Sequence, residues 1–443
     1  MRRAPGWRRT VYPSLRRRKT YSSIASGWIR DSKVFAGTPS ASAAPSGTET
    51  GSRPSRSAFS SCRAALALVV AALCLHDPPA ATAAAPEQGL LQKGSFPGSY
   101  LLPGTQVSVR VGGYLKVDVI HDFDAIGSED SFDPRTIPTD GSEGENTQIH
   151  SRQTRLNLDV RTPTEPGDAR LFVEVDFFGS GNSLRLRHAY ATIGGLLAGQ
   201  TWSTFMDEDA LPPTLDFEEP VAYPLIRVAQ VRWTQPLAQD WYVALAIEAP
   251  DSEIEAPRAL GHREDPWPDL TSRLRWTHGM SHVQVSAYAG GARYRLGMGG
   301  KDDEFLWAGL LTGSVKLFGK NRFLFQLGYG DGLARYRGDL VAAPDEDGAL
   351  EALPVAAVMA SYEHFWTESL SSNFCYSVAH ASSTHGQAGS AIQNLEYAAV
   401  NLAWRYSSWA SVGVEYLYGS REDRDGSLGE ANRVMVSFRF VLP

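Results

Sequence analysis

The side chains in this sequence best suited to bind a solute are basic residues that recur along extended segments. Arg185 and Arg187, like Arg433 and Arg439, are an even number of positions apart, so they leave a strand on the same face. Planar guanidinium groups hold carboxylates through two parallel hydrogen bonds. The predicted set is Arg110, Lys116, Arg155, Arg161, Arg185, Arg187, Arg232, Arg405, Arg433 and Arg439. If the fold brings these segments together, the set predicts a surface that attracts anions.

A segment rich in acids and prolines follows the extended run 196–204. Its acids are Asp207, Glu208, Asp209, Asp216, Glu218 and Glu219. Facing a basic surface across a constriction, these carboxylates would create a transverse field that orients dipolar or multiply charged solutes. The alternative is an ordinary solvated loop, in contact with divalent cations or lipopolysaccharide. The spacing favours the constriction.

Motifs of catalysis are absent from the sequence. It contains no G-x-S-x-G elbow, no H-E-x-x-H helix and no phosphate-binding glycine loop. Its histidines occur singly, and no Ser-His-Asp set can be assembled from spacing. The acids of 124–145 and 345–351 lack the spacing of a calcium-binding EF-hand. We therefore predict no catalytic residue, no bound metal and no cofactor.

The first 83 residues predict a leader rather than part of the fold. Residues 53–63 are basic, 64–75 are apolar, and Ala81-Thr82-Ala83 offers the small residues of a cleavage site, so 53–83 indicate a secretory signal peptide. Residues 1–52 are rich in Arg, Ser, Ala and Gly, which is typical of an unstructured leader or a mis-assigned translation start. We expect 84–106 to form a short periplasmic segment before a barrel over 107–443.

The chain after residue 83 is strongly acidic. It carries 29 basic and 46 acidic side chains, a net charge of about −17, which argues against nucleic acid as a partner. Cys375 is the only cysteine after residue 83, so this part cannot form an internal disulfide. No apolar run there approaches the roughly 20 residues of a membrane helix.

Apolar and polar residues alternate with period two throughout this part of the chain. Near the C-terminus, Val434, Val436, Phe438 and Phe440 interleave with polar or charged neighbours. The same rule predicts about 16 strands. They cover 107–119, 156–160, 171–178, 184–193, 196–204, 227–234, 241–248, 270–278, 282–296, 305–317, 322–330, 354–365, 370–381, 395–406, 411–419 and 434–440.

The connections between these strands alternate between short turns and longer, acidic loops. Short turns occupy regions such as 194–195 and 318–321, whereas 124–148, 205–226 and 333–353 are long. This sorting is typical of a transmembrane barrel with periplasmic turns and extracellular loops, and it makes 205–226 the third outer loop. A soluble sandwich is the weaker alternative, because the polar face carries charged residues on strand after strand. In the barrel, this polar face would line the lumen.

Lumen arginines have two interpretations. Each one could pair with an acid of the wall, such as Asp118, Asp159, Glu174, Asp176 or Glu415, and this is the better hypothesis for any single residue. As a set, the predicted basic residues outnumber the acids, which favours an anion-preferring pore. Two other functions stay open: a barrel hydrolase acting on lipids, and a structural or adhesive barrel with a filled lumen.

Five strings in this order and spacing resemble the DcaP-type porins of Gram-negative outer membranes. They are Gly-Gly-Tyr-Leu-Lys-Val-Asp at 112–118, Thr-Pro-Thr at 162–164, Val-Glu-Val-Asp-Phe-Phe-Gly at 173–179, Leu-Arg-Leu-Arg-His-Ala-Tyr at 184–190 and Ala-Gly-Gln-Thr-Trp-Ser-Thr-Phe-Met-Asp at 198–207. The similarity is densest over 100–235.

The resemblance implies an integral outer-membrane protein without enzymatic activity. It implies trimers of 16-stranded barrels that pass small anions, dicarboxylates among them, with the third loop folded into the pore. Expected partners are such anions, outer-membrane lipid and lipopolysaccharide. Two features depart from the family: the 20 or so residues before the first strand leave little room for a periplasmic helical extension, and Val-Leu-Pro follows Phe440 at the C-terminus.

Overall fold

The computed structural model describes residues 92–165, 167–255, 261–296 and 299–442. It divides the chain into two units, one of which contains Lys93–Pro443 and is described below. The other, Val34–Gln92, lies almost entirely outside the described residues, as do the predicted signal peptide over 53–83 and leader over 1–52. No helix among the described residues is long and apolar enough to cross a membrane.

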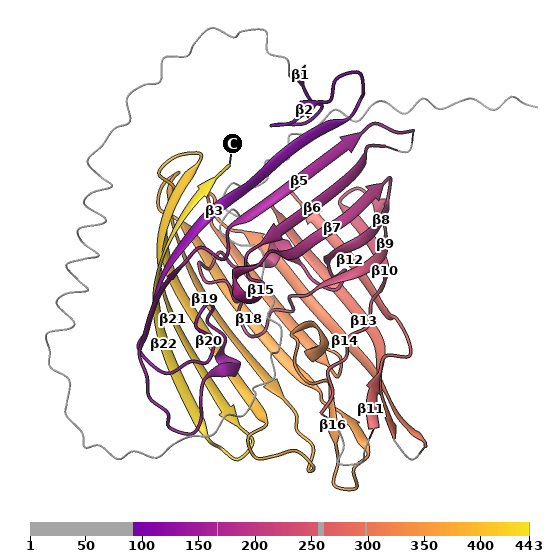
Figure 1. Cartoon of the computed structure of the whole chain (residues 1–443), viewed down its shortest axis with the longest axis vertical. Coiled ribbons are helices and arrows are strands. Elements are labelled where there is room, and N and C mark those ends of the chain that lie inside the picture. The colour runs from indigo at the N-terminus through magenta and orange to yellow at the C-terminus, as the bar shows by residue number, and fades with distance from the viewer. Residues whose placement is uncertain (1–91, 166, 256–260, 297–298, 443) are drawn as a thin grey trace, which may run out of the picture. The chain divides into compact units, whose positions relative to one another are not determined.

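Sixteen long strands make up the wall of the described unit (Figure 1). They are β3 (Ser108–Asp122), β5 (Arg155–Thr162), β6 (Ala169–Asp176), β7 (Arg185–Ile193), β8 (Leu196–Trp202), β9 (Arg227–Ala238), β10 (Trp241–Glu248), β12 (Asp269–His278), β13 (Ser281–Leu296), β14 (Lys301–Lys316), β15 (Arg322–Gly330), β18 (Val355–Phe365), β19 (Leu370–Ala381), β20 (Ile392–Trp404), β21 (Ala410–Asp423) and β22 (Leu428–Val441). Each is antiparallel to the next, and β22 pairs with β3. The wall is therefore a closed 16-stranded antiparallel barrel, which confirms the predicted fold class.

Shorter elements extend or decorate this wall. They are the strands β1 (Gln92–Lys93), β2 (Tyr100–Leu101), β4 (Asn146–His150), β11 (Gly261–Glu264), β16 (Ala342–Pro344) and β17 (Leu350–Ala352), and the 3-10 turns η2 (Pro134–Thr136), η3 (Ser180–Asn182), η4 (Glu208–Ala210) and η5 (Ala334–Tyr336). β4 pairs with the second half of β3, and β11 pairs with the end of β13. β4 thus begins near the end of the long loop predicted over 124–148, and β11 lies in the connection between β10 and β12.

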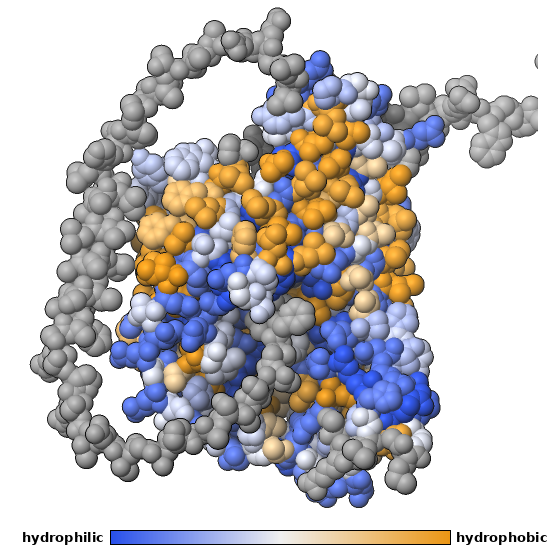
Figure 2. Space-filling view, viewed as in Figure 1, coloured by the Kyte–Doolittle hydropathy of each residue, from blue (hydrophilic) through white to orange (hydrophobic). Residues whose placement is uncertain are grey.

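Closure of the barrel allows strands to cross a membrane and still carry charged residues on one face. Every backbone N–H and C=O of a spanning segment must be paired, and a closed barrel has no free edge. Its inner face is shielded from lipid, so charged side chains can lie there. Apolar side chains of one parity, such as Leu158, Leu245 and Val285, are exposed on the outside, whereas Asp159 and Gln284 of the other parity are buried. Figure 2 shows apolar residues covering much of the face formed by β3 and β5 to β10.

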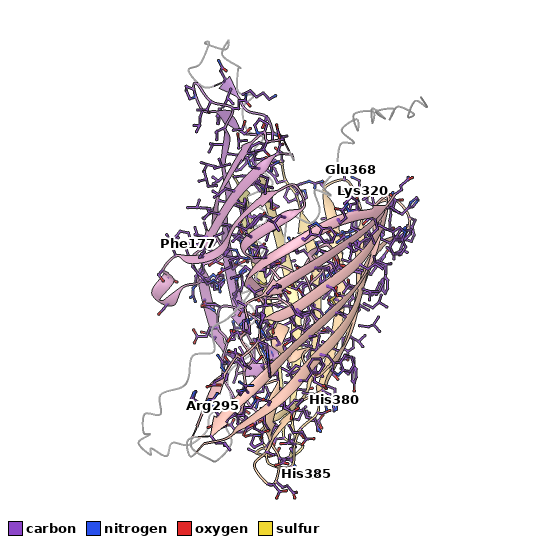
Figure 3. All side chains as sticks on the ribbon, turned by 90° about the vertical axis from the view of Figure 1, so that its right-hand side faces the viewer. Phe177, Arg295, Lys320, Glu368, His380 and His385 are labelled. Carbon is purple, nitrogen blue, oxygen red and sulfur yellow. The ribbon has the colours of Figure 1, made fainter. Side chains whose placement is uncertain are left out.

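The wall is uneven in height. β5 to β8 contain only seven to nine residues each, whereas β13 and β14 contain 16. The end with the short turns carries Lys320 and Glu368, and the opposite end carries the long loops and His385 (Figure 3). The C-terminus and β2 lie at the end with the short turns (Figure 1). We take this end as periplasmic, since barrels of this kind have short periplasmic turns.

Candidate functional site

The third outer loop, L3 (residues 203–226), folds into the barrel between β8 and β9. The carboxylate of Glu415 on β21 accepts hydrogen bonds from Leu215 N and Asp216 N, at 2.8 Å each. Lys116 Nζ on β3 donates to the Leu215 carbonyl at 2.7 Å. Ser377 Oγ on β19 accepts from Ala222 N at 2.9 Å. L3, which leaves the wall between β8 and β9, is therefore anchored to the continuous stretch of wall from β19 through β22 to β3.

Apolar side chains of L3 give the loop a reason to leave the solvent. Phe205, Leu215 and Tyr223 are at most 3 % exposed. They belong to a cluster that includes Phe132 of the first loop and Tyr336 of η5. Burying side chains of this size contributes roughly 1.5–3 kcal/mol each. The described loops thus pack together as a core inside the outer half of the barrel.

Asp207 and Asp209, at the start of L3, are bound to basic residues of the facing wall. Asp207 is buried, and its carboxylate accepts hydrogen bonds from Arg275 Nη1 at 3.1 Å, His282 Nε2 at 2.9 Å and Thr312 Oγ1 at 2.6 Å. Burial alone would raise the pKa of Asp207, but His282 and Arg275 lower it to about 2. Asp209 accepts from Arg275 Nη2 at 2.6 Å. Because both acids share Arg275, their charges are only partly neutralised.

The later acids of L3 are neutralised in other ways. Asp216 accepts from Phe132 N at 2.9 Å and from Arg433 Nη1 at 3.3 Å. Glu218 lies 3.4 Å from Arg135 Nη2 of the first loop. Glu219 is buried, and burial together with the neighbouring Glu218 and Asp216 raises its pKa well above the ordinary range. Both effects favour the neutral, protonated form of Glu219.

A basic wall of seven guanidinium groups faces the lumen on the other side. It comprises Arg155 on β5, Arg185 and Arg187 on β7, Arg227 and Arg232 on β9, Arg273 on β12 and Arg439 on β22. Arg227 lies close enough to Arg185 and Arg155 for their positive charges to repel each other. Arg273 and Arg232 repel each other in the same way. Besides Asp207, which Arg275 binds, the carboxylates among these groups in the described residues are Glu174, Asp176, Glu208 and Glu248. The wall therefore has an excess of three positive charges.

Several members of the basic wall are also held in place by its acids. Arg187 is fully buried and binds Asp176 at 2.6 Å and Glu174 at 3.1 Å. Arg185 binds the same Asp176 at 2.6 Å. Tyr114 lies below Arg439 and Arg155, with 4.1 and 5.1 Å between each guanidinium carbon and the ring centre. Individual arginines are thus paired or stacked, while the set keeps its positive excess.

Three predicted pore residues serve other purposes in the structure. Lys116 and Arg433 are fully buried: Lys116 holds the Leu215 carbonyl, and Arg433 binds Asp122 at 2.5 Å and Asp216 at 3.3 Å. Both are anchors of L3 rather than open parts of the wall. Arg405 follows the end of β20 and donates to the Glu368 carbonyl, which places it at the turn end of the barrel (Figure 3). Its role as a pore-lining residue stays a prediction.

Arg110 and Arg161 also lie away from L3, near the periplasmic end. Both surround Asp159, and Arg170 of β6 joins them. The residue-level prediction missed Arg170, Arg227, Arg273 and Arg275. Arg273-Leu-Arg275 repeats the pattern of Arg185-Leu-Arg187, so alternation could have identified that pair. Arg227 stands on the apolar parity of β9, at its junction with L3, so alternation could not identify it.

No metal site emerges from the described part of the chain. No group of three or more His, Cys, Asp or Glu side chains there is placed to hold a metal ion. The acids of L3 meet arginine, histidine and backbone N–H groups instead. The site as built can attract, orient and pass charged solutes.

Comparisons with known proteins agree with this geometry. The family model of the DcaP outer membrane protein matches residues 100–441. The outer membrane channel DcaP of Acinetobacter baumannii superposes with a TM-score of 0.69 at 22 % identity, covering 78 % of this chain and all of that one. An anion-selective porin from Comamonas acidovorans superposes with a TM-score of 0.53 at 9 % identity, covering 76 % of this chain and all of that one. No curated protein sequence matches the chain.

Proposed function

Because the chain belongs to the DcaP outer membrane protein family and forms a closed barrel, it is a channel of the outer membrane, and we propose that it passes small anions by diffusion. Dicarboxylates, a solute class implied by the resemblance, suit paired guanidinium groups because each carboxylate can accept two parallel hydrogen bonds. Passage follows the concentration gradient, and the channel performs no chemistry.

The observation that carries this proposal is the imbalance of charge across the lumen. Asp207, Asp209, Asp216 and Glu218 of L3 are bound by Arg275, Arg433 or Arg135, and burial raises the pKa of Glu219, which favours its neutral form. The basic wall keeps its excess of three positive charges. Fixed charges of one sign in a low-dielectric channel raise the local concentration of oppositely charged solutes. The result is a preference for anions over cations.

L3 narrows the passage rather than supplying a strong negative face. Its buried apolar side chains fill part of the lumen, and the exposed carboxylate of Asp209 shares Arg275 with Asp207. The transverse field predicted from the sequence is therefore weaker than six opposed acids would produce. Asp207, Asp209, Asp216 and Glu218 act as contacts that fix the constriction loop, and the wall arginines select the solute.

A reversal-potential measurement tests this function. Purified protein in a planar bilayer under a tenfold KCl gradient should give step-like conductance and a zero-current potential with the sign for chloride permeation. Cation selectivity would refute the selectivity mechanism. The absence of conductance steps would favour a filled structural barrel, and esterase activity lost on substitution of a single serine would favour a hydrolase.

We further propose that the short wall of β5 to β8 is covered by a second copy of the chain in a homotrimer. Strands of seven to nine residues fall at or below the 9–11 that a tilted strand needs to cross the hydrocarbon layer. An apolar hollow of about 310 Å³ lies there, lined by Leu171, Ala191, Ile193 and Ala198. Lipid and lipopolysaccharide would contact the taller wall.

Matched tryptophan substitutions test the position of this interface. Ala198→Trp should raise the monomer fraction in size-exclusion chromatography with light scattering, because it fills the hollow that a second copy would occupy. Ala356→Trp on β18, which is also exposed on the outside, is the control and should leave the oligomer unchanged. Equal effects of both substitutions would place the interface elsewhere.

A further inference from the structure

Three arginines converge on one buried carboxylate at the periplasmic end of the barrel. Asp159 on β5 has no exposed surface. It accepts two hydrogen bonds from Arg161, at 3.0 and 2.8 Å, and two from Arg170, at 3.0 Å each. Arg110 Nη2 lies 3.6 Å from the same carboxylate. The cluster has three positive charges and one negative charge.

The exposure of these groups differs in a way that favours a ligand. The side chains of Arg110, Arg161 and Arg170 are 36, 30 and 29 % exposed, whereas that of Asp159 is 0 % exposed. The carboxylate therefore holds the guanidinium groups together from behind. Arg170 Nη1 also donates to Tyr190 Oη at 3.0 Å, whereas the outer edges of Arg161 and Arg110 stay accessible. Arg110 Nε is buried without a hydrogen-bond partner in the described structure. Asp168 of the β5–β6 turn also acts on Arg161, so one positive charge of the cluster stays uncompensated.

Aromatic rings pack against each guanidinium group. Phe96, in the segment before β3, lies 4.1 Å from the guanidinium carbon of Arg161 and 5.7 Å from that of Arg110. Phe172 and Tyr190 lie 4.7 and 5.6 Å from that of Arg170. Rings at these distances orient the planar groups and reduce their contact with water, which strengthens their attraction for an anion.

The segment that carries Phe96 is itself fixed to the barrel. β2 pairs with the first residues of β3, and Ser95 N donates to Ser108 Oγ at 2.9 Å. Ser99 Oγ accepts from Phe96 N at 3.2 Å and donates to its carbonyl at 2.6 Å. Phe96 is consequently a built part of the cluster, with only 8 % of its surface exposed.

This cluster is separate from the basic wall beside L3. Arg161 stands six positions after Arg155 on β5, which corresponds to about 20 Å along an extended strand. Arg161 also pairs directly with Arg170 across the β5–β6 hairpin, whose turn belongs to the periplasmic end. An anion that leaves the constriction would meet this cluster at the mouth of the pore.

We propose that Arg110, Arg161 and Arg170 form a second anion site, at the periplasmic mouth, that binds a small carboxylate. The proposal rests on the proposed function, because it assigns a further binding site to the same class of solute. Forked guanidinium groups match the two oxygens of a carboxylate, and Phe96, Phe172 and Tyr190 provide apolar surface for its carbon skeleton. The site gives the solute a resting place between the constriction and the periplasm.

Side-specific block of single channels by succinate tests the site. The variant Asp159→Asn/Arg161→Gln/Arg170→Gln removes two guanidinium groups together with the carboxylate, so no buried charge is left unpaired. Succinate added on the periplasmic side should block this variant with about tenfold lower affinity than wild type. Affinity from the extracellular side should change less, because the basic wall is intact.

Two controls separate this site from general effects of charge and folding. The matched variant Arg293→Gln/Arg295→Gln/Asp303→Asn carries the same changes on outward-facing positions of β13 and β14 and should keep wild-type affinity. Arg170→Lys keeps the charge and the fold but loses the fork, so it should still weaken succinate binding several-fold.

Unchanged succinate affinity in a variant that remains anion-selective would overturn this site and leave the proposed function intact. A wild-type channel without anion selectivity would instead refute the proposed function. The variant could instead weaken block by inorganic phosphate and leave block by succinate unchanged. That result would overturn the assignment of the site to a carboxylate.

Discussion

Neutralising Arg232 and Arg273 should reduce anion selectivity without unfolding the barrel. The structure gives neither side chain a hydrogen bond or ion pair to a described residue, and the two lie close to each other on β9 and β12. By contrast, removing Arg185 and Arg187 would leave Asp176 buried without a cation. The variant Arg232→Gln/Arg273→Gln therefore isolates the effect of charge on permeation.

The magnitude follows from the charge count of the basic wall. Its excess of three positive charges falls to one. A solute about 7 Å from each removed charge loses roughly 0.5 kcal/mol in total at 0.15 M salt, and roughly 1 kcal/mol at 0.01 M salt, if the effective dielectric constant is that of water. Anion occupancy should fall about twofold at the higher salt concentration while cation occupancy rises equally, so the permeability ratio should drop about fivefold.

Reversal potentials in a planar bilayer under a KCl gradient measure this ratio at both salt concentrations. The matched control is Arg293→Gln/Arg295→Gln, which removes two guanidinium groups from the outside of β13. An unchanged ratio in Arg232→Gln/Arg273→Gln would refute the selection by wall arginines. So would an equal loss in the control, because the effect would then report total charge.

Three further predictions concern the attachment of L3. Glu415→Ala removes the carboxylate that accepts hydrogen bonds from the backbone N–H groups of L3, and each such charge-assisted bond contributes about 1.5–3 kcal/mol. The loop should then move more, so single-channel recordings should show greater open-channel noise. Unchanged noise would contradict the role of Glu415 as an anchor. Arg433→Gln leaves Asp122 and Asp216 without their cation and should lower the unfolding free energy by about 3–5 kcal/mol in denaturant titrations, where a loss below 1 kcal/mol would contradict its role. Burial and nearby acids raise the pKa of Glu219 in the folded state above its value in the unfolded chain. The contribution of Glu219 to the unfolding free energy is therefore fully present at low pH and is lost as the pH rises through the folded-state pKa. Glu219→Gln should therefore melt at a higher temperature than wild type at pH 8 and at the same temperature at pH 4; an equal difference at both pH values would contradict this.

The strands were predictable because a barrel in lipid imposes a strict alternation. The predicted strands 241–248, 322–330 and 370–381 have the bounds seen in the structure. Lipid requires apolar residues on one parity, and every strand is long enough to repeat the signal. β4 and β11 were missed because they lie in loops beyond the apolar belt, where the alternation is not enforced.

The partners of individual charges could not be predicted in the same way. L3 brings Asp207 to Arg275 and Asp216 to Arg433 by folding across the lumen, and no local pattern encodes contacts between residues 68 or 217 positions apart. The alternation of apolar and polar residues predicts that the side chains of Lys116 and Arg433 point inward, as they do in the structure. Their contacts with L3 could not be predicted, because they depend on how the loop packs. The direction of the Arg405 side chain could not be predicted, because this residue lies one position beyond its strand, where parity no longer fixes direction.

The central claim is that the basic wall makes this outer-membrane channel prefer anions. The most direct measurement is the zero-current potential of the purified wild-type protein in a planar bilayer, with a tenfold KCl gradient and no other solute. The charge excess predicts a potential whose sign and size correspond to chloride permeating several times better than potassium. A potential near zero, or one of the sign for potassium, would contradict it.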